Sequence, residues 1–248
     1  MRIVVIGATS AIAEHCCRLW VQRQACDLLL VARDADRAER VAQDLRVRSP
    51  ASTVEVASLD FLDAGVIGRL AEQAQGTDKG PIDLVLIAHG WLPEQGLVQG
   101  DLALCRDTIA VNAVSPALFA EAFAAPLASA GRGTLAIIGS VAGDRGRKAN
   151  YTYGAAKGFI ERYAEGLQHR LAGSGVAVVL VKPGPTDTPM AAPMKARGGR
   201  PASVDEVARA TVRGIDAKRP VFYVPARWAL IMFVVRNLPR FVFNRLNI

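Results

Sequence analysis

The segment "ANYTYGAAKGF", residues 149–159, contains two tyrosines and one lysine whose spacing could support proton transfer. It opens a stretch with the apolar periodicity of a helix, where residues four apart share a face and residues six apart do not. Tyr153 can therefore lie over Lys157, whereas Tyr151 cannot and is expected at a pocket wall. A nearby ammonium favours the phenolate form of tyrosine, so the pair could exchange a proton with a carbonyl or an alcohol. The same spacing is common on solvated helix faces. Whether this pair takes part in chemistry therefore depends on the elements around it.

Composition predicts one domain in a reducing compartment. The chain has 248 residues, of which 51% are hydrophobic and 21% charged, which is typical of a single soluble α/β domain with a sizeable core. The four cysteines, Cys16, Cys17, Cys26 and Cys105, lack metal-ligand spacing, so no metal site is expected. The chain opens on a strand pattern and not on a signal peptide, so we expect the cytoplasm.

Short apolar runs alternate with helical patterns along the whole chain. Strands are expected at residues 2–6, 27–31, 53–57, 82–88, 133–139, 176–181 and 221–224, and helices near 11–23, 35–47, 63–74, 101–130, 151–172 and 203–217. Nearly continuous apolar strands indicate burial on both faces. The order predicts a single α/β domain over residues 1–248, a Rossmann-type doubly wound parallel sheet of about seven strands with helices on both faces, which binds ligands at the carboxyl ends of the strands.

The segment "KPGPTDTPMAAPMKARGGRPAS", residues 182–203, contains five prolines and three glycines. This is too irregular for an ordinary turn. We expect a mobile substrate lid near residues 183–203.

A phosphate-binding turn is expected after the first strand, where "GATSAIAEH" leads directly into a helix. Gly7 would form the tight turn, and Thr9 and Ser10 would supply hydroxyls and amides at the helix N-terminus. Ala11 and Ala13 occupy the places of the second and third glycines in the usual fingerprint. A strand-to-helix turn without a ligand is the alternative.

The ends of the second and third strands bear on cofactor choice. Arg33 follows the second strand, where a cation favours the 2′-phosphate of NADP(H) and a carboxylate would favour NAD. Asp34 competes for that role, but its place in "ARDADRAER" is typical of a helix N-cap. Asp60, after the third strand, could meet the adenine amino group or cap the following helix.

Ser140 ends the fifth predicted strand in "IIGSVAG", thirteen residues before Tyr153, and "VNAVSPA" supplies Asn112 on the preceding helix. This set, with Tyr153-x-x-x-Lys157, resembles the short-chain dehydrogenase/reductase family over nearly the whole chain. "KPGPTDTPM" is similar to the family's Pro-Gly segment after the sixth strand. The resemblance implies an NADP(H)-dependent enzyme, with cofactor-binding residues Gly7, Thr9, Ser10, Ile12, Arg33, Asp60, Phe61, Ala88, Gly90, Tyr153, Lys157, Pro183, Gly184, Thr186 and Thr188.

The resemblance also implies catalytic roles. Tyr153 would donate the proton to a ketone oxygen, Ser140 would hydrogen-bond that oxygen, and Lys157 would bind the nicotinamide ribose and favour the phenolate. Asn112 would hold a water that links Lys157 to solvent. In one departure, the family's usual Asn-Ala-Gly after the fourth strand reads "AHG" here, which brings in His89. We interpret His89 as a structural substitute, with contact to cofactor or substrate as the alternative.

A narrower resemblance concerns the substrate. "RWALIMFVVRNLPRFVF" and "SVAGDRGRKANYTYG" are similar to the decaprenylphosphoryl keto-pentose reductases, which implies a lipid-linked keto-sugar as one candidate among hydrophobic ketones. The alternative enzyme is a 3-oxoacyl or generic carbonyl reductase. The alternative outside the enzymes is a dinucleotide-binding sensor or scaffold protein without turnover. The family resemblance further implies a homo-oligomer, either a dimer or a tetramer.

The excess of positive charge lies late in the chain. The net charge is +7, and Lys195, Arg197, Arg200, Arg209, Arg213, Lys218, Arg219, Arg227, Arg236, Arg240 and Arg245 face only Asp205, Glu206 and Asp216. No nucleic-acid-binding motif accompanies them, so nucleic acid is not an expected partner.

The C-terminal segment 226–248 contains an apolar run, residues 227–236, that is bracketed by Arg227 and Arg236. It is too short to span a bilayer. A helix that is apolar around its circumference must be buried in its own fold, in a subunit interface or in lipid. Packing on protein and peripheral attachment to a membrane both remain open.

Overall fold

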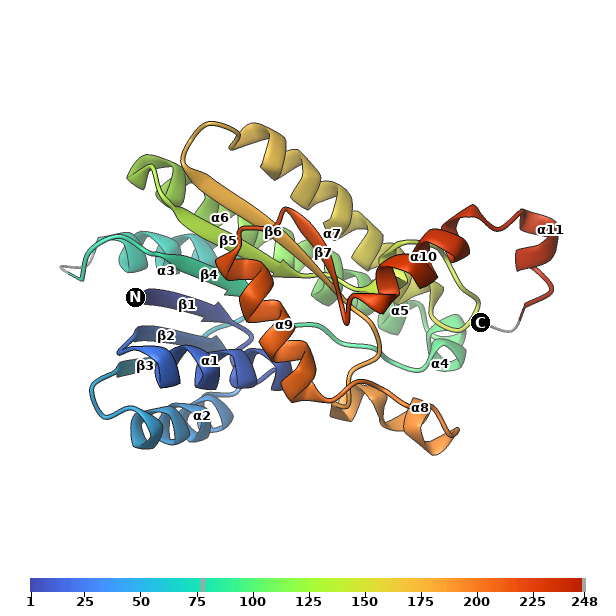
Figure 1. Ribbon diagram of the computed structural model, residues 1–248, viewed down its shortest axis with the longest axis horizontal. Helices are drawn as coiled ribbons and strands as arrows, with labels where there is room; N and C mark the ends of the chain where they lie inside the picture. The colour runs from blue at the N-terminus through green and yellow to red at the C-terminus, as the bar shows by residue number, and fades with distance from the viewer. Residues whose placement is uncertain (77–78, 247–248) are drawn as a thin grey trace.

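Seven parallel strands form one sheet in the order β3-β2-β1-β4-β5-β6-β7 in the computed structural model, which describes residues 1–76 and 79–246 (Figure 1). The strands are β1 Arg2–Ile6, β2 Asp27–Ala32, β3 Thr53–Ser58, β4 Leu84–Ile87, β5 Gly133–Ile138, β6 Val176–Pro183 and β7 Val221–Val224. This confirms the predicted doubly wound sheet. The strand order reverses between β1 and β4, which is where folds of this class bind ligands.

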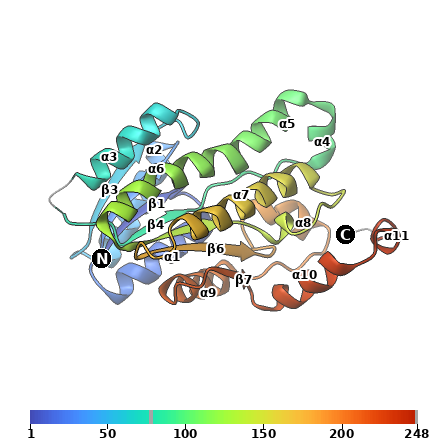
Figure 2. The same cartoon turned by 90° about the horizontal axis from the view of Figure 1, so that it is seen from above.

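Helices cover both faces of the sheet. They are α1 Ala11–Arg23, α2 Ala35–Arg48, α3 Ala64–Gln75, α4 Gln95–Gly100, α5 Leu102–Ile109, α6 Ser115–Ala130, α7 Tyr151–Arg170, α8 Ala192–Ala196, α9 Val204–Asp216, α10 Arg227–Asn237 and α11 Arg240–Phe243. In Figure 1, α1, α2 and α9 lie on one side of the sheet and α3, α6 and α7 on the other. Figure 2 shows the same elements from above, with α5 and α6 following one another end to end and α7 alongside them.

The apolar strands bury side chains on both faces because successive residues point to opposite sides. Within β1, Ile3 and Val5 belong to the core cluster beneath α1 and α9, whereas Val4 and Ile6 belong to the cluster beneath α3, α6 and α7. This double burial explains why the strand does not alternate between apolar and polar residues.

The helix expected over residues 101–130 is divided in the structure. It consists of α5, a π-helical segment Ala110–Val114, and α6. By length and composition the stretch Leu102–Ala130 is the one helix among the described residues that could cross a membrane. Phe119 and Phe123 in this stretch are fully buried in the core beneath the sheet. It is therefore a core helix of the domain.

The apolar run at residues 227–236 forms α10 but is not buried in its own domain. Met232 is its only buried residue, whereas Leu230 and Phe233 are 71% and 67% exposed. The sequence left open whether this segment packs on protein or on lipid. The prediction that it packs on its own domain is wrong for most of this helix. Met232, which is fully buried, and Trp228, which is partly buried, lie where α10 packs against the body of the fold.

Candidate active site

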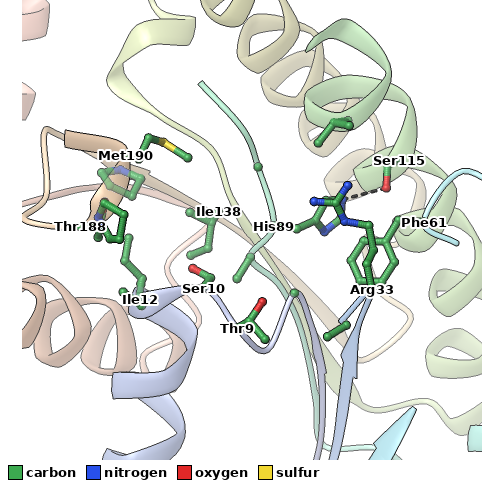
Figure 3. A pocket seen from close by; sticks show the side chains of 18 of the residues that line it. Thr9, Ser10, Ile12, Arg33, Phe61, His89, Ser115, Ile138, Thr188 and Met190 are labelled. Atoms are coloured by element: carbon green, nitrogen blue, oxygen red, sulfur yellow. Dashed lines mark hydrogen bonds between the residues drawn. The ribbon is translucent and has the colours of Figure 1, made fainter. Parts of the chain in front are cut away.

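A cavity of about 620 Å³ lies at the carboxyl ends of the central strands (Figure 3). All fifteen residues expected to bind the cofactor line it. The cavity wall also includes residues that the sequence reasoning did not assign to it, among them Arg37, Ser115, Ile138 and Met190. One continuous surface thus joins the glycine turn after β1 to Tyr153 and Lys157 on α7.

The turn after β1 requires glycine at residue 7. Its φ is +82°, and a Cβ placed there would lie 2.7 Å from the Cβ of His89. Only glycine fits both the backbone conformation and the close approach. Ser10 is the N-cap of α1 and makes no capping hydrogen bond with its side chain, so its hydroxyl is available to a ligand at the helix N-terminus.

Two arginines line the cavity beyond β2. The Asp34 carboxylate accepts a hydrogen bond from the Arg37 backbone N–H at 2.9 Å, which confirms that Asp34 caps α2. Arg33 makes no ion pair with any residue in ranges 1–76 and 79–246. Arg37 was missed as a lining residue, and helical spacing does not relate it to Arg33, because Arg33 precedes the N-cap Asp34 and lies outside α2. The end of β2 thus presents two cations.

Asp60 lines the cavity after β3 and does not cap α3. Its Oδ1 accepts a hydrogen bond from the Leu62 N–H at 2.8 Å, whereas the N-cap of α3 is Asp63. The alternative interpretation of Asp60 as a helix cap is therefore wrong.

Tyr153 and Lys157 lie one turn apart on α7, as the spacing predicted, and both are buried. The Lys157 Nζ lies 5.7 Å from the centroid of the Tyr153 ring and donates to the carbonyl oxygen of Ile138 at 3.0 Å. Tyr151, at the start of α7, is 45% exposed and does not contribute to the cavity wall. The pair on α7 therefore faces the cavity, and the expectation that Tyr151 forms a pocket wall fails for this cavity.

Burial shifts the pKa values of Tyr153 and Lys157 away from their ordinary values. Desolvation raises the pKa of Tyr153 to about 12, while the Ser140 hydroxyl and the positive charge of Arg147 act in the opposite direction. Desolvation also lowers the pKa of Lys157 to about 8. Tyr153 is therefore a protonated donor at neutral pH, next to an ammonium that is held near its titration point.

Arg147 was not assigned a role from the sequence. Its Nε is buried and has no hydrogen-bond partner among the described residues, and burial lowers the pKa of its guanidinium. Its charge favours the Tyr153 phenolate through space. No residue spacing signals this interaction, because residues 147 and 153 are joined by a turn that precedes α7.

Ser140 and Asn112 lie beside the cavity and not in its wall. The Ser140 Oγ accepts a hydrogen bond from the Ala142 N–H at 3.1 Å, which fixes the turn after β5. Asn112 is fully buried in the π-helical segment, where its Oδ1 accepts from the Trp91 N–H at 2.9 Å. Its Nδ2 donates to the carbonyl oxygens of Trp91 and Thr108. Asn112 thereby joins the loop after β4 to the α5–α6 junction, and π-helical turns of this kind are frequent at functional sites.

His89 is packed among aromatic rings at the cavity wall. Its ring lies edge-on to Phe61, with centroids 4.9 Å apart, and its Nε2 is 2.8 Å from the Ser115 Oγ (Figure 3). Burial, together with the charges of Lys157 and Arg33, lowers the pKa of His89 to about 3. The ring is therefore neutral at physiological pH and supports the strand end, while one side of it remains part of the cavity wall.

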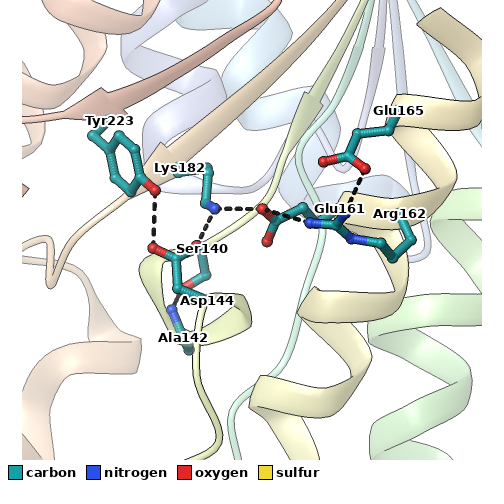
Figure 4. A network of polar contacts seen from close by, with 8 residues as sticks. All are labelled: Ser140, Ala142, Asp144, Glu161, Arg162, Glu165, Lys182 and Tyr223. Atoms are coloured by element: carbon teal, nitrogen blue, oxygen red, sulfur yellow. Dashed lines mark hydrogen bonds and ion pairs between the residues drawn. The ribbon is translucent and has the colours of Figure 1, made fainter. Parts of the chain in front are cut away.

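A buried network of ion pairs lies beside the loop that follows Ser140 (Figure 4). Lys182 on β6 is 1% exposed and pairs with Asp144 and with Glu161, the latter at 2.8 Å. The Tyr223 hydroxyl donates to Asp144 at 3.0 Å. Burial alone would lower the pKa of Lys182, but the two carboxylates outweigh it and raise that pKa. The network connects β6, β7 and α7 to the loop that follows Ser140.

A family model described as short chain dehydrogenase matches residues 1–198. The chain belongs to the short chain dehydrogenase family. This assignment agrees with the parallel sheet and with the Tyr153–Lys157 pair in the cavity, and it makes the protein an NAD(P)-dependent oxidoreductase.

Relatives of this short chain dehydrogenase cover nearly its full length. It is 34% identical to an uncharacterized oxidoreductase of Mycobacterium tuberculosis over 98% of this chain and 96% of the relative. It is 31% identical to an uncharacterized oxidoreductase of Streptomyces coelicolor over 98% and 95% of the two chains. A short-chain dehydrogenase from Sphingobium yanoikuyae, solved in complex with NADPH, is 26% identical with a TM-score of 0.81 over 97% of each chain.

The residues of this short chain dehydrogenase fit a nicotinamide dinucleotide. The glycine turn admits close backbone approach, Ser10 and the N-terminus of α1 offer donors to phosphate, and Arg33 and Arg37 place positive charge at the far end. Tyr153 and Lys157 line the same cavity. The arrangement can therefore hold a dinucleotide with its reactive ring near Tyr153.

Proposed function

We propose that this enzyme is an NADPH-dependent reductase that converts a ketone into a secondary alcohol. The observation that carries the proposal is the position of Tyr153 and Lys157 in the wall of the cavity that also contains Gly7 and Arg33. A sensor would need the dinucleotide contacts but not a buried proton donor. The retained Tyr153 therefore favours turnover over a sensor or scaffold role.

The proposed roles divide binding from proton transfer. Bound NADPH supplies a hydride to the carbonyl carbon. Tyr153 donates its hydroxyl proton to the carbonyl oxygen, Ser140 hydrogen-bonds that oxygen, and the Lys157 ammonium stabilises the resulting phenolate. Lys157 also binds the nicotinamide ribose, and Asn112 holds a water that restores the proton from solvent. The high pKa of Tyr153, about 12, keeps the hydroxyl protonated until hydride transfer begins.

The preference for NADPH over NADH rests on Arg33. It follows β2, lines the cavity and has no ion-pair partner within the part of the chain that the structure describes. Arg37 adds a second cation from the first turn of α2. We propose that the two guanidinium groups bind the 2′-phosphate, which arginine recognises well because its donors match phosphate geometry. Asp60 and Phe61 line the same end of the cavity and would contact the adenine.

We propose a lipophilic ketone as the substrate, with a lipid-linked keto-sugar as the narrower candidate. Segment 183–203 supplies Pro183, Gly184, Thr186 and Thr188 to the cavity wall and continues into exposed apolar residues, including Met190 and Met194. This segment is proposed as the lid that closes over the substrate of the single domain. A 3-oxoacyl or generic carbonyl substrate is the alternative.

We further propose a homo-oligomer in the cytoplasm with peripheral membrane contact. Support for the oligomer comes from large exposed apolar residues on neighbouring helices, namely Leu102 and Ile109 on α5 and Phe159 on α7. Exposed charges of both signs accompany them, including Arg106 and Asp107. A two-fold contact places the same surface of each copy against the other, so apolar residues with charges of both signs suit such a contact better than charges of one sign.

The test is NADPH oxidation by the purified protein with a panel of ketones. The panel should contain long-chain ketones, a keto-sugar carried on a lipid and a 3-oxoacyl thioester. Loss of NADPH absorbance with a ketone, and none with the Tyr153→Phe variant, supports the reductase. Tight NADPH binding without turnover on any ketone class would favour the sensor.

A further inference from the structure

The two C-terminal helices carry an exposed apolar surface at one end of the molecule. We call Leu230, Phe233, Val234 and Phe241 the C-terminal apolar surface, and their exposed fractions are 71%, 67%, 51% and 68%. Leu230 and Val234 lie one turn apart and therefore share a face of α10. Figures 1 and 2 both show α10 and α11 projecting beyond the carboxyl ends of the strands, the end at which the cavity lies.

The charge of this segment has one sign. No Asp or Glu occurs after Asp216, while Arg227, Arg236, Arg240 and Arg245 lie within and around α10 and α11. These arginines are exposed and make no ion pair among the described residues. The surface therefore combines apolar side chains with uncompensated positive charge.

Two contacts hold the segment to the loops of the active site. The Arg145 guanidinium, five residues after Ser140, donates to the carbonyl oxygens of Val235 and Leu238, and it lies 3.8 Å from the centroid of the Phe243 ring. The indole of Trp228 lies so close to Gly184 that a Cβ at residue 184 would be 1.9 Å from its Nε1. The C-terminal helices are thus fixed relative to the cavity.

An anionic lipid surface matches these features better than a second copy of the chain. A two-fold contact through the C-terminal apolar surface would bring the four arginines of one copy against the same four of the other. Like charges brought together cost several kcal/mol in an interface. Acidic head groups instead attract the arginines while the bilayer boundary accepts the apolar side chains.

We propose that the C-terminal apolar surface docks on anionic membranes and turns the cavity mouth toward the bilayer. The 11 residues of α10 span about 16 Å, too little to cross a hydrocarbon core, so the helix lies in the plane of the interface. Phe233, Phe241 and Leu230 enter the head-group boundary while the arginines contact lipid phosphates. The biological role of this docking rests on the proposed function. Docking would give the active site access to a ketone whose lipid tail stays in the membrane.

The test is sedimentation of the full chain with vesicles, without cofactor or ketone, so that its outcome is independent of turnover. Vesicles of phosphatidylglycerol and phosphatidylcholine are compared with phosphatidylcholine alone at low and high salt. We expect binding to the anionic vesicles at low salt and weaker binding at high salt. A protein that stays in the supernatant with anionic vesicles at low salt would overturn the proposal.

Single substitutions locate the surface. Phe233→Ser and Phe241→Ser should each weaken vesicle binding by about tenfold or more, because each removes a large apolar side chain from the boundary. Arg240→Gln should weaken it by about fivefold. The controls are Val47→Ser, at an apolar residue that is 81% exposed on α2, and Arg40→Gln on the same helix.

Equal losses in the controls would show that binding is not through α10 and α11, and would contradict the proposal. The same preparations should be examined by analytical ultracentrifugation. If Phe233→Ser and Phe241→Ser lower the oligomeric mass and leave vesicle binding unchanged, the surface belongs to a contact between copies and the proposal is wrong. NADPH oxidation, measured separately, tests the reductase activity.

Discussion

The Lys157 ammonium is held between the Tyr153 ring, whose centroid lies 5.7 Å away, and the carbonyl oxygen of Ile138, which accepts its hydrogen bond at 3.0 Å. The contact joins α7 to the end of β5, 19 residues earlier in the chain. Since Lys157 is also buried, keeping its cation beside the Tyr153 ring costs desolvation free energy.

The stability of the protein should depend on the ionisation of Lys157. Its pKa is about 8 in the folded protein against 10.5 in an unperturbed lysine, so between these pH values the unfolded chain binds a proton that the folded protein does not. The free energy of unfolding should therefore rise with pH across that window, by at most about 1.4 kcal/mol per pH unit from this group. Below pH 8 both states are protonated and the contribution stays constant.

Chemical denaturation of the wild type and Lys157→Met over this pH range isolates the contribution. The variant should lack the rise, because methionine carries no ionisable group. Parallel pH profiles for the two proteins would show that the lysine titrates normally in the folded state.

Arg33→Ala should remove most of the preference for NADPH over NADH. A charged hydrogen bond to the 2′-phosphate contributes about 1.5–3 kcal/mol, which corresponds to a loss of about tenfold to a hundredfold in NADPH affinity. NADH affinity should change little, because that cofactor has no 2′-phosphate. Fluorescence titration with both cofactors measures the effect, and Arg40→Ala on the outer part of α2 is the matched control. Equal affinities for the two cofactors in the wild type would refute the assignment.

Lys182→Met should destabilise the fold by about 3 kcal/mol or more. The substitution leaves the Asp144 carboxylate buried without an ion-pair partner among the described residues and leaves Glu161 with only Arg162, at 3.4 Å, which costs more than the loss of the pair itself. Lys195→Met is the control, because Lys195 pairs with Asp187 at the surface, where both side chains are about half exposed. That variant should change stability by less than about 1 kcal/mol in urea denaturation. Similar losses for both lysines would argue against an energetic role for the buried network.

Local patterns predicted the elements of the sheet and most of the cavity wall. Strand runs such as "RIVVI" and the helix starts after them are short-range signals, and parallel strands bring their carboxyl ends together without further information. Tyr153 and Lys157 were paired by helical spacing alone. These local signals were therefore enough to predict most of the residues that line the cavity.

Contacts between distant segments were not predictable in this way. Asp144 and Lys182 are 38 residues apart and pair only because η2, the short 3-10 turn Val141–Gly143, directs the loop after β5 toward β6. Asn112, in the π-helical segment that interrupts the long helix, hydrogen-bonds with Trp91, and helical periodicity carries no signal for that contact. The apolar content of α10 predicted that it is buried in protein or in lipid. Its exposure depends on how little of the domain lies beside it, which the local sequence does not show.

The identity of the proton donor tests the central claim most directly. Turnover of NADPH with the best ketone should be compared in the wild type, Tyr153→Phe and Tyr151→Phe, with NADPH affinity measured by titration in each. We predict that Tyr153→Phe lowers kcat by about a hundredfold or more and leaves NADPH affinity nearly unchanged, because the ring remains and only the donor is lost. Tyr151→Phe should retain kcat within about twofold, since this residue lies outside the cavity wall. Comparable losses in the two variants, or a Tyr153→Phe enzyme that still reduces the ketone at the wild-type rate, would contradict the account.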